Sequence, residues 1–466
     1  MVDSKRHNGE RKPNLTTDMT QGNSMIMIAR FCFPLLLGNI FQQMYSVADT
    51  IIVGKGIGDK ALAAVGACNS IQFFILGFII GMTGGFGILL SQAFGAGDVL
   101  LLRRRTAMSA LICLIVGIMV TLVSLLFIEK YFIYMETPAN IIHNSLKYFR
   151  VILCGITITM GNNLCLNLLR ALGDGKTPLK AMMVSSLINI ILDLVFIVVL
   201  KTGAEGAAIA TLIAQVSSVL FALRKIVKIP ELMMERENWK VRPFMIRELL
   251  ITGLPVAFMN SVTAIGNMVL QYFVNLMGSN YVAAYAACSK ITGLGQQPGQ
   301  AVGLTMLTFT GQNLGAGRYD RIKDGVKKGV LLSVLVNIPI IILLVGFPTK
   351  LASLMLTEPN IIAMSKEYLP ITGICMVLLG FLFVFRSTCQ GMGQTLMPML
   401  SGGVEVVMRV SVVMLAVGLL GFYRIAVAEV SAWIGAWLML MATYFYLIRR
   451  KKPYQNETNE LRKGTV

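Results

Sequence analysis

The sequence predicts an all-α integral membrane protein with twelve transmembrane helices, arranged as two six-helix lobes that are related by an internal parallel repeat. Three observations lead to this prediction. Of the 466 residues, 55% are hydrophobic and only 14% are charged, whereas soluble domains carry about 25% charged residues. The chain contains twelve mostly apolar runs close to the length of about 20 residues that a spanning helix needs. Its two halves also match each other at an offset near 220 residues.

The predicted spans follow one another along the chain with polar connections between them. They cover residues 28–53, 62–90, 106–128, 148–169, 181–200, 206–223, 249–276, 282–310, 329–347, 367–390, 398–420 and 425–448. Residues 1–24 are polar and lack the apolar core of a signal peptide, so we expect no cleavage there. The first span then acts as its own insertion signal.

The basic residues predict the side of the membrane on which each connection lies. If the N-terminus is inside, 29 of the 41 Lys and Arg residues fall on the inner side, nine on the outer side and three within spans. Basic loops stay in the cytoplasm, so we expect a multi-pass protein of the cell inner (plasma) membrane with both termini cytoplasmic. This asymmetry accounts for most of the +18 net charge, and no nucleic acid partner is needed to explain it.

Four blocks carry the internal repeat. Residues 91–97 (SQAFGAG) match 311–317 (GQNLGAG), and 63–67 match 283–287. The other two blocks are single-residue pairs: Gly173 and Pro178 with Gly393 and Pro398, and Pro34 and Asn39 with Pro255 and Asn260. Six spans in each half give both copies the same orientation, an arrangement that places a transported substrate between the halves.

The repeat divides the chain into five parts. They are an N-terminal tail (1–24), an N-terminal lobe (25–223), a cytoplasmic interlobe linker (224–248), a C-terminal lobe (249–448) and a C-terminal cytoplasmic tail (449–466). We expect the protein to be a monomer in the lipid bilayer.

Acidic side chains inside apolar spans are costly and therefore mark candidate functional sites. Asp49 lies in the first span and Asp193 lies near the middle of the fifth, one helical turn after Asn189. Two carboxylates that lie close together in a low dielectric keep at least one proton near neutral pH, which is the chemistry of a proton relay. Asp49 also ends a polar stripe at helical spacing that contains Asn39, Gln42 and Ser46. This stripe either lines a substrate cavity or holds helices together.

Neighbouring spans add further candidate site residues, and each of these also has a purely structural explanation. Asn163 and Asn167 share a face of the fourth span and either line the same cavity or pack helices together. Thr211 in the sixth span either contributes its hydroxyl to the site or bonds its own helix. Gln296 and Gln300 flank Pro298 in the eighth span, which predicts an interrupted polar helix that bends or lines the cavity.

The second half does not repeat the acids, because Val413 stands where the repeat would place the partner of Asp193. It contains four other intramembrane charges, which balance: Arg386, Glu405, Arg409 and Glu429. The simplest interpretation is a buried neutral network that holds the lobe together. A role in substrate binding or gating is the alternative.

The sequence offers no catalytic site and no cofactor site. Its two histidines are His7 and His143, it has no CxxC pair, and it lacks the HExxH and GxSxG motifs of metalloproteases and hydrolases and the complete GxxxxGK[ST] motif of ATP-binding loops. A membrane-embedded enzyme is therefore not expected, and transport would have to be driven by an ion gradient.

Taken together, these residues resemble the multidrug and toxic compound extrusion (MATE) family over nearly the whole chain after residue 20. The resemblance rests on the first span with Pro34 and Asp49, the SQAFGAG turn, the 170–178 loop and the repeat. It implies two six-helix lobes around a V-shaped cavity. It also implies efflux of small cationic or amphipathic organic compounds by antiport with H+ or Na+.

The resemblance also implies roles for individual residues. In the DinF-like branch of the family, acids of helices one and five bind the coupling cation together with neighbouring amides. Asp49, Asn189 and Asp193 match that pattern, Thr211 fits it, and Asn163 and Asn167 match loosely. H+, or a Na+ ion held by Asp49 and Asp193, is the expected coupling ion. The NorM-like branch uses acids in helices seven and ten, which this sequence lacks, so a Na+ site in the C-terminal lobe is not expected.

One rival function remains open. A flippase of a lipid-linked precursor has a related fold and needs a cationic cavity, which Arg386, Arg409 and Lys290 would supply. Twelve spans rather than fourteen count against it.

Overall fold

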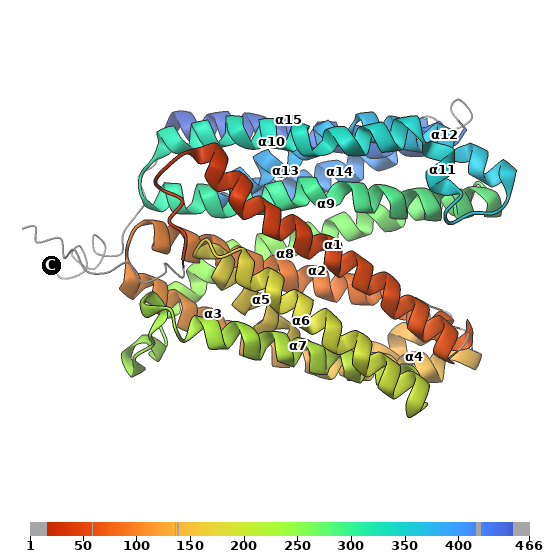
Figure 1. Cartoon of the computed structure of the whole chain (residues 1–466), viewed down its shortest axis with the longest axis horizontal. Coiled ribbons are helices and arrows are strands. Elements are labelled where there is room, and N and C mark those ends of the chain that lie inside the picture. The colour runs from red at the N-terminus through yellow and green to blue at the C-terminus, as the bar shows by residue number, and fades with distance from the viewer. Residues whose placement is uncertain (1–15, 58, 136, 138, 416–420, 451–466) are drawn as a thin grey trace, which may run out of the picture.

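The computed structural model describes residues 16–57, 59–135, 137, 139–415 and 421–450, and these residues form helices without any strand. Figure 1 shows two groups of long helices that run side by side. Parts of both predicted tails, residues 416–420 of the eleventh predicted span, and the side chains of Lys55 and Lys60 lie outside the described residues.

The first half contains six spans. They are formed by α1 (Ser24–Ile57), α2 (Asp59–Gly95), α3 (Val99–Tyr134), the pair α4 (Ala139–Cys154) and α5 (Ile156–Ala171), α6 (Lys176–Asp193) continued by the π-helix η1 (Leu194–Val199), and α7 (Ala204–Ile226). The span predicted over 148–169 is bent by 47° between α4 and α5. The bend lies at Gly155, where a Cβ atom would stand only 1.9 Å from a methyl carbon of Leu212 on α7.

The second half repeats this order after a short linker. The linker contains two 3-10 turns, η2 (Pro230–Leu232) and η3 (Arg236–Trp239). The spans are α8 (Pro243–Asn275), α9 (Ser279–Gly315), α10 (Tyr319–Gly346) followed by the short α11 (Pro348–Ala352), the pair α12 (Pro359–Ile374) and α13 (Met376–Gly391), α14 (Leu396–Leu415), and α15 (Tyr423–Arg450). The α12–α13 pair bends by 43°, at the place related by the repeat to the bend in the first half.

The membrane-spanning potential of these helices agrees with the predicted twelve spans. Nine described helical segments are long and apolar enough to cross a membrane, and the two bent pairs raise the number to eleven. The twelfth is α9, which has 37 residues but a more polar sequence. Most of the helices continue beyond the apolar runs, so most of the helical rods are longer than the predicted spans.

The first helix of each half crosses from one lobe to the other. The beginning of α1 packs in the core of the second half through Ile28, Phe31 and Leu35. The beginning of α8 packs in the core of the first half through Met245 and Leu249. Both helices then return to their own halves, so each lobe is completed by residues of the other. Figure 1 shows α1 running obliquely between the two groups.

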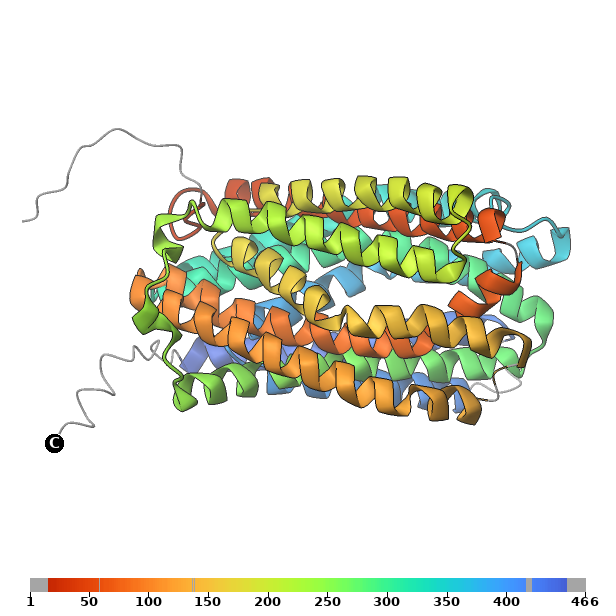
Figure 2. The ribbon, with the colours of Figure 1, turned by 90° about the horizontal axis from the view of Figure 1, so that it is seen from below.

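The two ends of the described chain lie at the same end of the molecule. Both the start of α1 and the end of α15 lie there, together with the η2–η3 linker (Figures 1 and 2). We call this the terminal end. The α2–α3 and α9–α10 turns also lie there, since each follows a helix that runs from the opposite end.

Candidate functional site

The acids of the first and fifth predicted spans come together in one cluster between α1, α6 and α7. We call Asp49, Asn189, Asp193 and Thr211 the carboxylate cluster. Asp193 is fully buried, Asn189 is 1% exposed and Asp49 is half-buried. The carboxyl groups of Asp49 and Asp193 lie close enough to share a proton through a hydrogen bond.

Asn189 orders the cluster by bridging two of its members. Its Nδ2 donates to Asp193 Oδ2 at 2.7 Å, and its Oδ1 accepts from the backbone N–H of Thr211 at 3.1 Å. The Thr211 hydroxyl donates to the carbonyl of Ala207 in its own helix at 3.0 Å. Thr211 therefore contributes its backbone to the cluster, while its hydroxyl hydrogen is used in the helix.

Two oxygens of the cluster lack a protein partner. Asp49 Oδ1 and Asp193 Oδ1 are buried without a hydrogen bond from any described residue. A buried carboxylate oxygen is costly unless a donor or a cation compensates it. Among the described residues there is no group of three His, Cys, Asp or Glu side chains that would hold a multivalent metal. Two carboxylates fit a proton or a monovalent cation instead.

Two tyrosines that we did not predict from the sequence complete the surroundings of the cluster. The hydroxyl of Tyr45 on α1 lies beside Thr211 and near both carboxylates. Tyr148 on α4 is buried and also lies near both carboxylates. Tyr45 precedes Asp49 by one helical turn, so the helical spacing alone could have placed it on the same face of α1 as Asp49. Nothing in the local sequence of Tyr148 indicates its position, because α4 reaches the site only through packing.

An apolar layer closes the cluster on the side that faces away from the terminal end. Val53, Ile197 and Ala207 form a small buried cluster of their own. Each lies one turn beyond a cluster residue: Val53 after Asp49, Ile197 after Asp193, and Ala207 before Thr211. At Gly56 a Cβ would lie 2.6 Å from an Ile197 methyl carbon, so α1 and η1 touch here. The π-helical turn η1 begins directly after Asp193; such turns often lie at functional sites.

Comparison with known proteins identifies the family. The family model MatE matches the chain twice, over residues 34–195 and over residues 255–420. The chain belongs to the MatE family. Each matched segment lies within one half of the repeat.

Relatives of known name cover most of the chain. The "Probable multidrug resistance protein YoeA" of Bacillus subtilis is 27% identical in an alignment of 396 residues that covers 83% of this chain and 86% of that protein. The "Multidrug export protein MepA" of Staphylococcus aureus is 22% identical, over 93% of this chain and 96% of that protein. A solved structure titled as the outward-facing conformation of a multidrug resistance MATE family transporter has a TM-score of 0.88 at 24% identity, covering 95% of this chain and 99% of that one. This similarity confirms the twelve-helix fold.

Among the described residues, no hydrogen bond connects the amides of the fourth predicted span to the carboxylate cluster. Asn163 Nδ2 donates to the carbonyl of Thr159 in its own helix at 2.9 Å. Asn167 Nδ2 donates to Thr83 Oγ1 on α2 at 3.3 Å. The contacts of Asn167 match the helix-packing alternative, while Asn163 bonds its own helix.

The polar residues of α1 and α9 lie on partly open faces. Gln42, Ser46 and Gln300 are exposed, while Asn39 and Gln296 are half-buried. The predicted interruption of the eighth span at Pro298 is wrong, because α9 is a continuous helix around that residue. Proline removes one hydrogen bond, but the glycines on either side of it pack closely on the neighbouring helices: Gly295 on Ile340 and Gly299 on Phe383. α10 and α13 thus pack closely against the helix on both sides of the proline.

The four intramembrane charges of the second half form one buried network in this MatE protein. Glu405 accepts hydrogen bonds from Arg386 and, at 3.5 Å, from Arg409. Glu429 accepts from the hydroxyl of Tyr368 and lies within the electrostatic influence of Arg409. Two cations and two anions thus balance inside α13, α14 and α15.

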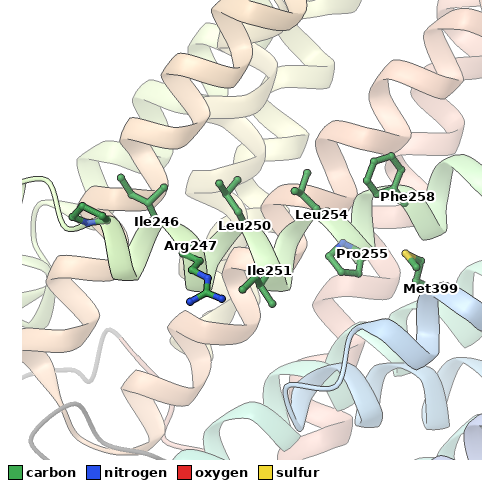
Figure 3. A pocket seen from close by; sticks show the side chains of 9 residues that line it. Ile246, Arg247, Leu250, Ile251, Leu254, Pro255, Phe258 and Met399 are labelled. Atoms are coloured by element: carbon green, nitrogen blue, oxygen red, sulfur yellow. The ribbon is translucent and has the colours of Figure 1, made fainter. Parts of the chain in front are cut away.

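A groove of 740 Å³ lies elsewhere, along one face of α8 (Figure 3). Its lining is apolar apart from Arg247 and includes Leu250, Leu254, Phe258 and, from α14, Met399. Phe258 is 52% exposed, so this face is open to the surroundings of the protein. None of the predicted site residues lines the groove.

Proposed function

We propose that this MatE protein is a secondary active antiporter that exports small cationic or amphipathic organic compounds in exchange for H+ or Na+. The proposal includes multi-pass insertion in the plasma membrane, action as a monomer, and no enzymatic activity. The names of the relatives YoeA and MepA support the substrate class. The single observation that carries the mechanism is the pair of half-buried Asp49 and fully buried Asp193, each with one oxygen that has no protein partner among the described residues.

The cluster supports ion coupling in a simple way. An incoming proton or Na+ is attracted by two carboxylates that the protein itself does not neutralise. Asp49 belongs to α1, which crosses between the lobes, whereas Asp193 belongs to α6. Binding of the ion between them therefore draws α1 toward α6, and we propose that this movement expels the substrate. Ion and substrate then weaken each other's binding by the same factor.

The orientation follows from the charges. We propose that the terminal end is cytoplasmic, because most of the basic residues lie in its tails and turns. The lobes meet at this end through α2 and α8, where a Cβ on Gly85 would lie 2.5 Å from the backbone of Gly253. In this orientation the structure represents the state closed to the cytoplasm. We propose that the lobes of residues 25–223 and 249–448 then rock about the 224–248 linker.

The lipid-precursor flippase is the less favoured function. It requires an uncompensated cationic cavity, but Glu405 and Glu429 balance Arg386 and Arg409. A buried charge that is already paired has little left to offer a pyrophosphate group.

Efflux of ethidium from proteoliposomes, with a pH gradient and a Na+ gradient imposed separately, tests the proposal. We expect one gradient to drive efflux in the wild type, and Asp193→Asn to abolish it. Asp320→Asn is the matched control, because Asp320 is an exposed acid at the start of α10. Efflux of normal rate in Asp193→Asn would contradict the assignment of the ion site. Absence of efflux under both gradients in the wild type would contradict drug antiport.

A further inference from the structure

Two glutamines from the two halves of the repeat tie the lobes together at the terminal end. Gln92 Nε2 on α2 donates to the carbonyl of Gly391 at 2.9 Å. Gln312 Nε2 on α9 donates to the carbonyl of Ala171 at 2.8 Å. The repeat relates Gln92 to Gln312 and Ala171 to Gly391, so each lobe makes the same bond to the other.

Glycines allow the backbones to meet at this place. A Cβ on Gly95 would lie 2.0 Å from the carbonyl oxygen of Gln312, and one on Gly315 would lie 2.0 Å from that of Gln92. Such distances exclude any side chain, because both groups belong to helix backbones. We call Gln92, Gly95, Gln312 and Gly315 the terminal gate.

One component of the interface is asymmetric. The segment before α8 is held by Arg103 on α3 through the carbonyls of Pro230 and Glu231, but among the described residues it has no hydrogen bond to the gate. Residues 16–23, which we call the strap, precede α1 and lie against the gate on one side only. The backbone N–H of Met19 donates to Gln312 Oε1 at 2.8 Å, and that of Thr17 donates to the carbonyl of Leu172 at 3.1 Å. Met19 is completely buried. The strap therefore touches both lobes, although it precedes the first span in the chain.

The strap is anchored mainly on the second half. Arg321 on α10 donates to the carbonyls of Gly22 at 2.7 Å and Met19 at 3.1 Å. Arg318 donates to the carbonyl of Thr20 at 2.9 Å, and Asn313 to that of Met19 at 3.2 Å. If the lobes separate, these bonds keep the strap on the second half. The contact that must break is the one at Leu172 and Gly173 of the first half.

Gly173 and Gly393, which the repeat relates to each other, have different neighbours, because the strap lies only against Gly173. Both have a positive φ, 78° and 82°. A Cβ on Gly173 would lie 2.1 Å from the carbonyl oxygen of Thr17 in the strap. A Cβ on Gly393 would meet only the side-chain nitrogen of Gln92, at 3.4 Å, which is an ordinary contact.

We propose that the strap is a one-sided brace that holds the terminal gate closed and biases this protein toward the state closed at the terminal end. The two glutamine bonds are present in both halves. The strap contacts are present on one side only, so they add a contribution to the free energy of gate closure that the repeat does not duplicate. Loss of the hydrogen bond between Thr17 and Leu172, together with the packing around it, should raise the ratio of open to closed gate about tenfold.

Hydrogen–deuterium exchange of the full-length protein in lipid nanodiscs tests the proposal without depending on transport. Gly173→Ala and Gly393→Ala share the strain of a positive φ, but only the first displaces the strap. We expect amides of residues 16–23, 92–97 and 312–317 to exchange about tenfold faster in Gly173→Ala than in Gly393→Ala. Equal exchange in the two variants would overturn the proposal.

A second pair of variants avoids backbone strain. Arg321→Gln removes the hydrogen bonds from Arg321 to the strap and the one from its Nε to Asn313 Oδ1, whereas Lys323→Gln removes an exposed charge from the same helix. We expect faster exchange of the strap and of both gate turns in Arg321→Gln alone. Release of the strap with unchanged exchange at 92–97 would show that the strap follows the gate without bracing it. Because the readout is exchange, a failure of the proposed antiport would leave this result interpretable.

Discussion

Asn189 Nδ2 lies 2.7 Å from Asp193 Oδ2, and this contact determines which oxygen of Asp193 remains for a cation. The other oxygen, Oδ1, is buried without a protein partner, as is Oδ1 of Asp49. Asn189 thus acts on the ion through Asp193, as residues behind a metal ligand commonly do. It is therefore a positioning residue.

Asn189→Leu should weaken binding of the coupling ion by about 10- to 100-fold. The variant keeps the volume but leaves Asp193 Oδ2 without its donor. The measurement is the ion concentration that gives half-maximal efflux. Asn275→Leu is the control, because Asn275 is an exposed amide at the end of α8. Equal ion dependence in the two variants would contradict the positioning role.

Tyr45→Phe should weaken ion coupling by about two- to tenfold, the value of one hydrogen bond. The variant removes only the hydroxyl that lies beside Thr211 and the two carboxylates. The same efflux titration measures it. Tyr134→Phe should have no effect, because Tyr134 is 85% exposed. An unchanged titration in Tyr45→Phe would remove the tyrosine from the site.

Glu405→Gln should destabilise the protein by about 3–5 kcal/mol, because it leaves Arg386 and Arg409 buried without their anion. Thermal unfolding in detergent measures the loss. The control is Glu129→Gln, which breaks the exposed pair with Arg150 and should cost at most about 1 kcal/mol. A stable Glu405→Gln protein with impaired efflux would favour a role of the network in substrate binding or gating.

Gly95→Ala should lower efflux about tenfold or more, because its Cβ would lie 2.0 Å from the Gln312 carbonyl and force the lobes apart. Gly84→Ala is the control on the same helix, since nothing lies within 4 Å of the added Cβ. Efflux from proteoliposomes under the driving gradient compares them. Normal efflux in Gly95→Ala would show that the lobes do not need to meet this closely.

Part of the candidate site could be predicted from the sequence because it depends on a single helix. The free-energy cost of an acid in an apolar span can be judged locally, so Asp49 and Asp193 stood out. The same local reasoning was wrong about α9, which continues through Pro298 and packs closely on its neighbours at Gly295 and Gly299. It also left open whether Asn167 packs helices or lines a cavity, because its partner Thr83 lies on another helix.

The sequence by itself determined the number of spans, the internal repeat and the helices that carry buried charge, because apolar length and charge cost are properties of short segments. Only the tertiary structure decided what lies beside what. It brought Tyr148 to the carboxylates, sent the beginnings of α1 and α8 into the opposite lobes, and placed the strap against Gln312. These contacts join residues far apart in the chain, and they depend on how whole helices pack, which no local pattern encodes.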